Sequence, residues 1–380
     1  MTLFPKTIAA VVAATATALS LTSTSAEAAT FSNPFYEVHV QSTPAFGTPS
    51  GGPQYGSWNA VTGPSHPTGP NNHILYNVML RDGTTTNTNF SSLRIFDPTG
   101  TTRDYAFGGR GDHSLGGIGN VNNLDPYRTS ESAGSVFGSN GFQTTWNLTP
   151  ENLEIVQDLV AVGTTYDNSA IYHTVELTNT GDSAISLGWR NLYDWTVNDP
   201  IFDDGPNNQI EVAGGVGVVI PATTNEFSYT PTPGSFARVS VDPIDPDLGV
   251  TYQPLLGLGY DPGFIATLPT TTPDLYNFVS WRQSQLTAYD YTVNPALNIT
   301  YQNPDPDGLR GDSAGLSYFT ATLDPGQSTR FTQVIFAAVP NGSIPGDTTS
   351  VPEPSSVLSV LAFGALGAAS QLKRKQQRKV

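Results

Sequence analysis

The 380-residue chain contains no cysteine and only two methionines. Without cysteine it cannot form a disulfide, a zinc–thiolate site or an iron–sulfur cluster, and it cannot use a thiol nucleophile. Basic residues are also scarce, because 16 Lys and Arg stand against 32 Asp and Glu, which gives a net charge of −16. Such a field repels nucleic acid and anionic membrane surfaces, so we expect no nucleic-acid partner.

The scarcity of basic residues is sharpest between residues 29 and 350. Six basic residues and two acidic ones lie outside that range. Residues 29–350, which we call the body, therefore contain ten basic residues, all arginine, and thirty acidic ones, which gives a net charge of −20. This charge favours solubility outside the cell and weak binding of divalent cations. The chain's lysines all lie near its two ends: Lys6, Lys373, Lys375 and Lys379.

Long helices are also excluded in the body, because the chain has 37 glycines and 30 prolines, and nearly all of them recur every few residues within 29–350. The apolar runs between them are short and rich in β-branched and aromatic residues, which is typical of strands. We therefore predict an all-β fold, a large antiparallel β-sandwich over residues 29–339. We prefer one domain there, and two smaller domains are the alternative. The predicted strands cover residues 73–80, 142–148, 153–162, 171–177, 185–194, 216–220, 237–241, 278–281, 297–301, 316–323 and 331–339.

Two turns are the clearest local signals. Asn179–Asp182 is predicted to close a hairpin in which Gly181 supplies a positive φ, and Pro325–Gly326 to close a second hairpin. Residues 41–72, rich in Pro, Gly, Ser and Thr, are predicted to form a long loop or arm anchored by Tyr55 and Trp58. Alternation along the strands predicts one buried face, made of Val175, Leu177, Leu187, Trp189, Tyr193, Leu323, Phe331, Val334 and Phe336.

The stretch from Thr174 to Asn207, a strand, a turn and a strand that ends near Asp194, resembles large supersandwich domains of the galactose-mutarotase type. The resemblance implies a supersandwich-like arrangement of the strands. It implies no particular activity, because sandwich folds host many unrelated functions.

The N-terminus has the features of an export signal. Lys6 precedes an apolar, alanine-rich stretch from Ile8 to Leu21. Ala26-Glu27-Ala28 then supplies the small-x-small pattern that signal peptidase recognises. We predict a signal helix within residues 1–28, removed by signal peptidase.

The C-terminus has three elements in a fixed order: Val351-Pro352-Glu353-Pro354, an apolar run over 357–369, and five basic residues within 373–379. The prolines favour an extended backbone, the apolar run suits a short membrane-spanning helix, and the basic end stays in the cytoplasm. This order resembles the PEP-CTERM sorting tail of exopolysaccharide-producing Gram-negative bacteria and cyanobacteria. The resemblance implies a sorting signal at Pro352, Glu353 and Pro354, transient anchoring in the membrane, and processing by an exosortase. We take 340–350 as a linker and 351–380 as the sorting segment.

Residues that would carry chemistry are few. The five histidines lack the spacing of metal ligands, and no nucleophile elbow or phosphate loop occurs. Acidic and aromatic residues gather between Trp189 and Asp204, as a sugar site would need, yet Trp189, Tyr193 and Trp195 fall on one face of one strand. A packed face explains that pattern more simply, and we predict no catalytic residue.

Calcium is the metal that the sequence would suit best. Residues 303–308, Asn-Pro-Asp-Pro-Asp-Gly, place oxygen ligands at alternate positions before a glycine. The twelfth position of the loop is Ala314 rather than a bidentate glutamate, so this is no EF-hand, and a simple acidic turn is the competing interpretation. The candidate ligands are Asn303, Asp305, Asp307 and Asp312.

These observations favour an exported, non-enzymatic cell-surface or extracellular-matrix protein, sorted by its C-terminal tail and associated with exopolysaccharide. The alternative is a secreted carbohydrate-binding module or carbohydrate-active enzyme. A third interpretation keeps the C-terminal helix as a permanent membrane anchor.

Overall fold

The structure is a computed structural model of the whole chain. It describes the following residues: 29–41, 55–67, 70, 73–75, 77–79, 85–87, 89–106, 121–166, 169–195, 208–212, 218–219, 226–230, 237–241, 255–258, 269–280 and 313–338.

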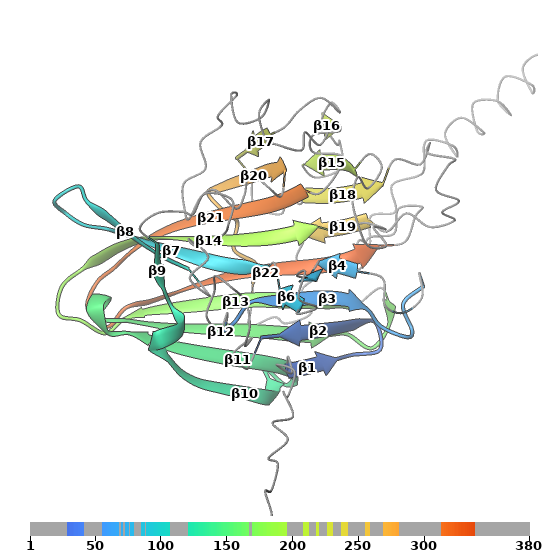
Figure 1. Cartoon of the computed structure of the whole chain (residues 1–380), viewed down its shortest axis with the longest axis horizontal. Helices are drawn as coiled ribbons and strands as arrows, with labels where there is room; N and C mark the ends of the chain where they lie inside the picture. The colour runs from blue at the N-terminus through green and yellow to red at the C-terminus, as the bar shows by residue number, and fades with distance from the viewer. Residues whose placement is uncertain are drawn as a thin grey trace, which may run out of the picture.

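Two large β-sheets make up the described part of the chain (Figure 1). The first has eleven strands, with the order β1-β2-β3-β4-β14-β21-β20-β17 and a branch in which β7 pairs with β14 and leads to β8 and β9. Its pairs are antiparallel except for β8 with β9. The strands are β1 (Ala29–Ser32), β2 (Tyr36–Val40), β3 (Trp58–Thr62), β4 (His73–Leu75), β7 (Phe90–Phe96), β8 (Thr102–Ala106), β9 (Val121–Asn123), β14 (Ile185–Trp195), β17 (Glu226–Tyr229), β20 (Leu275–Ser280) and β21 (Ser313–Leu323).

The second sheet has nine strands in the order β10-β11-β12-β13-β22-β19-β18-β15-β16, all antiparallel. They are β10 (Arg128–Val136), β11 (Ser139–Leu148), β12 (Leu153–Val162), β13 (Ala170–Asn179), β15 (Asn208–Val212), β16 (Val218–Val219), β18 (Ala237–Val241), β19 (Leu255–Leu258) and β22 (Ser328–Ala338). A separate ribbon pairs β5 (Asn77–Met79) with β6 (Thr85–Asn87), and two short 3-10 helices are η2 (Asp125–Tyr127) and η3 (Thr149–Glu151).

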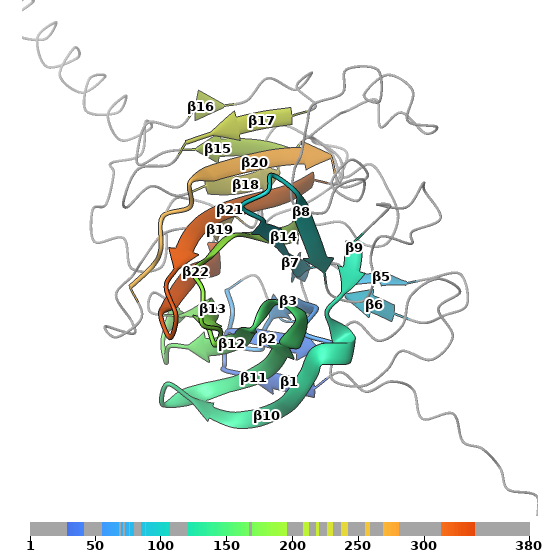
Figure 2. The same cartoon turned by 90° about the vertical axis from the view of Figure 1, so that its left-hand side faces the viewer.

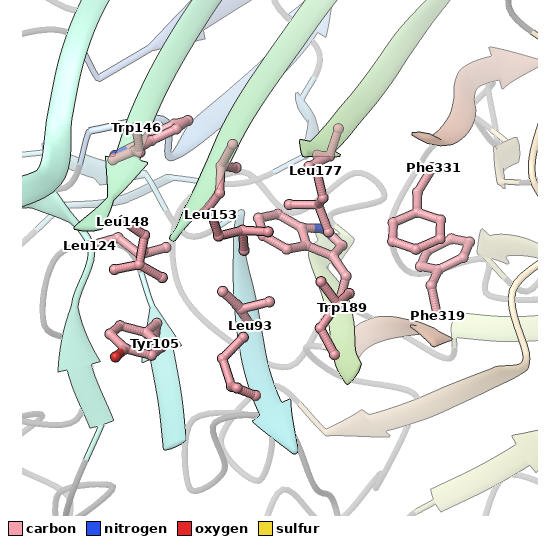
Figure 3. Close-up of a cluster of buried hydrophobic side chains, with 14 of the residues drawn as sticks. Leu93, Tyr105, Leu124, Trp146, Leu148, Leu153, Leu177, Trp189, Phe319 and Phe331 are labelled. Atoms are coloured by element: carbon pink, nitrogen blue, oxygen red, sulfur yellow. The ribbon is translucent and has the colours of Figure 1, made fainter. Parts of the chain in front are cut away.

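The two sheets face each other across a hydrophobic core (Figures 2 and 3). Trp189 on β14 lies in a cluster with Leu153 and Leu177 of the facing sheet. Phe319 of β21 and Phe331 of β22 stack with ring centroids 4.7 Å apart and so join the sheets directly. Burying each such side chain contributes about 1.5–3 kcal/mol relative to leaving it in water. The fold is the all-β sandwich that the sequence predicted.

The predicted burial is confirmed wherever the structure describes it, although one residue lies on a different face from the rest. Eight of its nine residues have at most 4% of their surface exposed: Val175, Leu177, Leu187, Trp189, Tyr193, Leu323, Phe331 and Val334. The side chain of the ninth, Phe336, lies outside the described residues. Seven of the eight point between the sheets, because side chains of a strand point to opposite faces in turn. Val334 lies three residues from Phe331 on β22, so it points to the other face of its sheet, where it is also buried.

Most of the predicted strands are present, several with nearly the predicted bounds. β12 and β18 begin and end where predicted, and β11, β13, β14 and β21 extend the predicted segments by a few residues. β22 begins three residues before the predicted segment and ends one residue before it does. The prediction for residues 297–301 lies outside the described residues. The interpretation of 41–72 as an arm was wrong for residues 58–62, which form β3 between β2 and β4. All five residues of β3 are buried, so exposed and buried positions do not alternate along it. The alternating pattern that predicts a strand is therefore missing there.

Both predicted hairpins were wrong in their pairing. β13 belongs to the nine-stranded sheet and β14 to the eleven-stranded sheet, so residues 180–184 cross between the sheets. Residues 324–327 likewise carry the chain from β21 across to β22. Local sequence sets the turn but not the sheet that the next strand joins. Gly326 takes the positive φ expected of it, +74°, whereas Gly181 has no positive φ.

Asn179 holds the two crossings together. Its side-chain amide donates to the carbonyls of Ser183 and Leu323 at 2.8 and 2.9 Å, and its Oδ1 accepts from the Gly181 amide at 2.9 Å. Its own backbone donates to the Gln327 carbonyl and accepts from the Gly326 amide, both at 2.9 Å. Asn179 is 1% exposed, so these bonds are shielded from water. One side chain therefore fixes both turns at the same corner of the sandwich.

An ion pair closes the sandwich at another point. The Arg103 guanidinium on β8 donates twice to the Glu151 carboxylate on η3, each bond 2.6 Å, and Tyr105 Oη donates to the same carboxylate at 2.6 Å. Asp97 contacts Arg103 from the other side at 3.1 Å. Burial alone would raise the pKa of Glu151, but the bonds from Arg103 and Tyr105 lower it below its usual value. The carboxylate stays charged and links the two sheets.

No helix within the described ranges is both long enough and apolar enough to cross a membrane.

Replacing Asn179 with alanine should lower the free energy of unfolding by about 2–3 kcal/mol, because the Leu323 and Ser183 carbonyls and the Gly181 amide lose their partner. Asn147, an exposed residue of β11, is the matched control, and Asn147→Ala should change stability by less than about 0.5 kcal/mol. Urea denaturation of both variants measures the difference. Equal midpoints would show that the corner does not depend on Asn179.

Candidate functional site

The residues predicted to carry function lie mainly outside the described part of the chain. The sorting signal Pro352, Glu353 and Pro354 and the calcium candidates Asn303, Asp305, Asp307 and Asp312 all fall there. So does the acidic stretch 196–204, and of Asp194 and Trp195 only the backbone, at the end of β14, is described. Among the described residues no three metal-binding side chains gather. The calcium site therefore stays a prediction.

The predicted aromatic strand face is buried. Trp189 and Tyr193 are each 0% exposed and point into the sandwich, as the packed-face interpretation expected. Four of the histidines lie in strands or in a bend: His39 in β2, His66 in a bend, His73 in β4 and His173 in β13. The fifth, His113, lies outside the described residues.

A row of buried polar side chains crosses the interior next to the hydrophobic core, and we call it the interior polar network. Each member is at most 1% exposed. Three members come from the nine-stranded sheet and four from the eleven-stranded sheet. They are Gln157 on β12, His173 on β13, Gln333 on β22, Asn191 and Tyr193 on β14, Ser317 on β21 and Ser91 on β7.

Asn191 and Gln333 form the centre of the network. Asn191 Oδ1 accepts from Trp189 Nε1 and from Ser91 Oγ, both at 2.7 Å. Asn191 Nδ2 donates to Gln333 Oε1 at 2.7 Å, and Tyr193 Oη donates to the same oxygen at 2.8 Å. Gln333 Nε2 donates to Ser317 Oγ at 2.8 Å. Four strands of the two sheets are thus joined by side-chain hydrogen bonds.

His173 continues the network towards β3. Its Nδ1 lies 2.8 Å from Tyr193 Oη, and its Nε2 lies 3.3 Å from Gln157 Oε1. Gln157 Nε2 donates to the Gly56 carbonyl at 2.7 Å, just before β3. The imidazole also meets the Trp58 ring edge-on, with centroids 5.4 Å apart. The interior polar network therefore runs from Trp189 to the Gly56 backbone.

Burial decides the ionisation of the network. It lowers the pKa of His173 to about 3 and raises the pKa of Tyr193 well above 10. A general acid or base works best with a pKa near the operating pH. At neutral pH both side chains are neutral, so they serve as hydrogen-bonding groups rather than as proton donors or acceptors in a reaction.

A second polar row lies on the opposite face of the eleven-stranded sheet. Ser92, Arg190 and Tyr318 stand directly opposite one another on β7, β14 and β21 and are buried. The neighbouring row is more exposed: Arg94 and Asp104 form a bidentate pair with both bonds at 2.7 Å. On the same face of β21, Thr320 Oγ1 donates to Asp274 at 2.7 Å. The more exposed row carries the guanidinium, carboxylate and hydroxyl groups of this face.

A hydroxyl, an imidazole and a carboxylate also line up near the N-terminus. His39 Nδ1 lies 3.1 Å from Thr30 Oγ1, and His39 Nε2 lies 3.1 Å from Glu37 Oε1. Burial lowers the pKa of His39, and the Glu37 charge partly offsets this. Thr30 and His39 are directly opposed on β1 and β2, and Glu37 is two residues from His39. Cross-strand pairing alone therefore accounts for this row, and we assign it no catalytic role.

Sequence reasoning missed the interior polar network, although a signal for it exists. Gln157, His173, Asn191 and Gln333 occupy inward-facing positions of predicted strands whose other inward residues are apolar. Polar residues at such positions must find partners in the interior. Their recurrence in four strands predicts a buried network, though not which residues pair.

Comparison with protein-family models and with curated protein sequences found no match. Among solved structures, the chain is similar to a galactose mutarotase-like protein from Lactobacillus casei, with 10% identity over 82% of this chain and 100% of that one, at a TM-score of 0.40. A protein from Synechocystis matches with 9% identity over 82% and 95% of the two chains, at a TM-score of 0.40. A polysaccharide lyase matches with 11% identity over 82% and 33%, at a TM-score of 0.37.

Acid should weaken the fold through His173. Its pKa in the folded state lies below the ordinary 6.5, so between about pH 6.5 and 3 the unfolded chain binds a proton that the folded chain does not. The contribution is complete above pH 6.5 and is lost as the pH falls. His173→Gln should reduce the loss of unfolding free energy between pH 7 and pH 5 by about 2 kcal/mol, measured by urea denaturation.

Glu131 provides a control of opposite sign. Burial raises its pKa to about 7, although Arg128 at 2.9 Å lowers it in part. The folded chain therefore binds this proton more readily than the unfolded chain, and the contribution is lost as the pH rises towards 7. Glu131→Gln should make the loss between pH 7 and pH 5 larger. Identical pH dependence in wild type and His173→Gln would contradict the assignment to His173.

Proposed function

We propose that this protein is an exported cell-surface or extracellular-matrix protein, sorted by its C-terminal tail and retained with exopolysaccharide. The observation that carries the proposal is the tail itself. A Pro-Glu-Pro segment, an apolar run and a basic end follow one another in the order of the PEP-CTERM sorting signal. The N-terminal segment supports it, because Ala26-Glu27-Ala28 suits signal peptidase at the other end of the same chain.

The body suits this role. A net charge of −20 over residues 29–350 keeps the protein soluble outside the cell, and the absence of cysteine makes folding independent of disulfide formation. In the interior, His173 and Tyr193 are neutral and engaged in hydrogen bonds, and Glu151 is paired with Arg103. These groups stabilise the sandwich, which supports a structural rather than a catalytic interpretation.

Exosortase and signal peptidase are the processing partners that this proposal requires. The apolar run over 357–369 holds the exported protein in the membrane until the tail is cut. After cutting, the acidic body is released towards the surface, and polysaccharide is the partner that we propose there.

Glu353→Ala should leave export intact but cause uncut protein to accumulate in the inner membrane of the native host, because the carboxylate between the two prolines is lost. Asp347→Ala, an acidic residue shortly before the tail, is the control and should be processed normally. Cell fractionation with mass spectrometry of both protein termini measures the outcome. If the Glu353 variant reaches the surface with the wild-type C-terminus, the sorting proposal is wrong.

A second candidate function is polysaccharide binding through the outer face of the eleven-stranded sheet. The exposed pair Asp274 and Thr320 and the Arg94–Asp104 pair support it, because carboxylate, hydroxyl and guanidinium groups on one face suit sugar hydroxyls. We propose that sugars contact this more exposed row. The buried row at Arg190 would support it from the same sheet.

Asp274→Ala should weaken binding to the exopolysaccharide of the native host several-fold in affinity electrophoresis. Asp182→Ala, an exposed acidic residue in the turn between β13 and β14, should leave binding unchanged. If wild-type protein does not bind any member of a polysaccharide panel, this second function is excluded. Release of free sugars from the panel would instead indicate a carbohydrate-active enzyme.

A further inference from the structure

The two ends of the interior polar network have fixed hydrogen-bonding roles. At one end, Trp189 Nε1 carries a proton and can only donate. At the other end, the Gly56 carbonyl can only accept. Trp189 faces an Asn191 oxygen at 2.7 Å, and Gly56 faces a Gln157 nitrogen at 2.7 Å. The side-chain amides and the proton positions between these ends must therefore be consistent with a donor at Trp189 and an acceptor at Gly56.

From the Trp189 end, each step follows from the one before. Asn191 presents Oδ1 to Trp189, so its Nδ2 faces Gln333 and Gln333 presents Oε1 to it. The same Gln333 oxygen lies 2.8 Å from Tyr193 Oη, and two oxygens at that distance need a proton between them. A phenol has one O–H proton, so Tyr193 donates that proton to Gln333 Oε1.

The Tyr193 oxygen is then an acceptor for its next neighbour, His173 Nδ1, at 2.8 Å. His173 must carry its proton on Nδ1. At the other end, Gln157 Nε2 donates to the Gly56 carbonyl, so Gln157 Oε1 faces His173 Nε2 at 3.3 Å. A neutral imidazole has one N–H, so a lone pair of Nε2 faces a lone pair of Gln157.

We propose that the interior polar network is one proton short and that His173 Nε2 is a buried proton-binding site. A proton bound there would donate to Gln157 Oε1. It would complete an unbroken series of donated hydrogen bonds from Trp189 to Gly56, across both sheets. The proton enters on Nε2 and no bond is broken, so the imidazole becomes an imidazolium. This site is independent of the proposed sorting function.

The surroundings set the pH range in which the site fills. His173 is packed against Trp58 of β3, Gln157 of β12 and Tyr193 of β14. Tyr193 is the titratable one of these neighbours and is neutral, and the structure gives His173 no described carboxylate contact. Burial opposes the cation, whereas the completed bond to Gln157 favours it. The site therefore fills below neutral pH, and the new bond offsets part of the cost of burying the charge.

The position of the proton on His173 tests the proposal. Nitrogen-15 NMR of the full chain, labelled on histidine, distinguishes the two neutral tautomers and the imidazolium, and contacts with the Trp58 ring identify His173. At neutral pH we expect the Nδ1–H tautomer. In Tyr193→Phe the acceptor for Nδ1–H is lost, so the proton should move to Nε2 and donate to Gln157.

Tyr172→Phe is the matched control, because Tyr172 is the adjacent buried tyrosine on β13 and points to the opposite face of that strand. It should leave the Nδ1–H tautomer unchanged. If Tyr193→Phe does not fold, Gln157→Glu replaces it: a carboxylate beside Nε2 should make His173 doubly protonated at a pH at which the wild type is neutral. The proposal is overturned by an Nε2–H tautomer or an imidazolium in the wild type at neutral pH, by an unchanged tautomer in Tyr193→Phe, or by an unchanged protonation state in Gln157→Glu.

Discussion

Polar groups placed between two facing sheets must find their hydrogen bonds inside the protein, and the described structure depends on how this constraint is met. An unpaired buried polar group costs about 1–3 kcal/mol, a large part of the net stability of a domain. Asn179 meets the constraint at the crossing turns, where backbone groups leave both sheets at once. Arg103 and Glu151 meet it with opposite charges. The interior polar network meets it between the sheets, where six strands supply partners.

The same constraint explains how far the sequence predicted the fold. Apolar alternation in β13 and β14 predicted these strands and their buried face, because the period of two is a local property. Pairing is not local: after Asn179 the chain crosses to the other sheet, although its turn looks like that of a hairpin. β3 escaped prediction because Trp58–Thr62 is buried on both faces and so does not alternate.

The candidate sites also differ in whether they depend on local sequence or on pairing between distant residues. Sorting and calcium signals are patterns of adjacent residues, so sequence alone suggests them, but they lie outside the described residues. The interior polar network joins residues as far apart as Asn191 and Gln333, 142 positions along the chain. Inward-facing polar residues indicate that such a network exists. Its connectivity needs the register of β14 against β21 and of β13 against β22.

The structural role of the body differs from the sorting role that we propose for the two ends of the chain. In the body, burial keeps His173 and Tyr193 neutral, so their chemistry is used for holding the sheets together. Because His173 is buried as a neutral imidazole, its contribution to stability is lost as the pH falls. The contribution of the partly buried Glu131 is lost as the pH rises towards 7. The two oppose each other between about pH 4.5 and 6.5. An exported protein meets the pH of its surroundings without the buffering of the cytoplasm, and groups of opposite sign flatten its stability over that range. This balance suits a protein whose proposed task is to persist at the cell surface rather than to turn over a substrate.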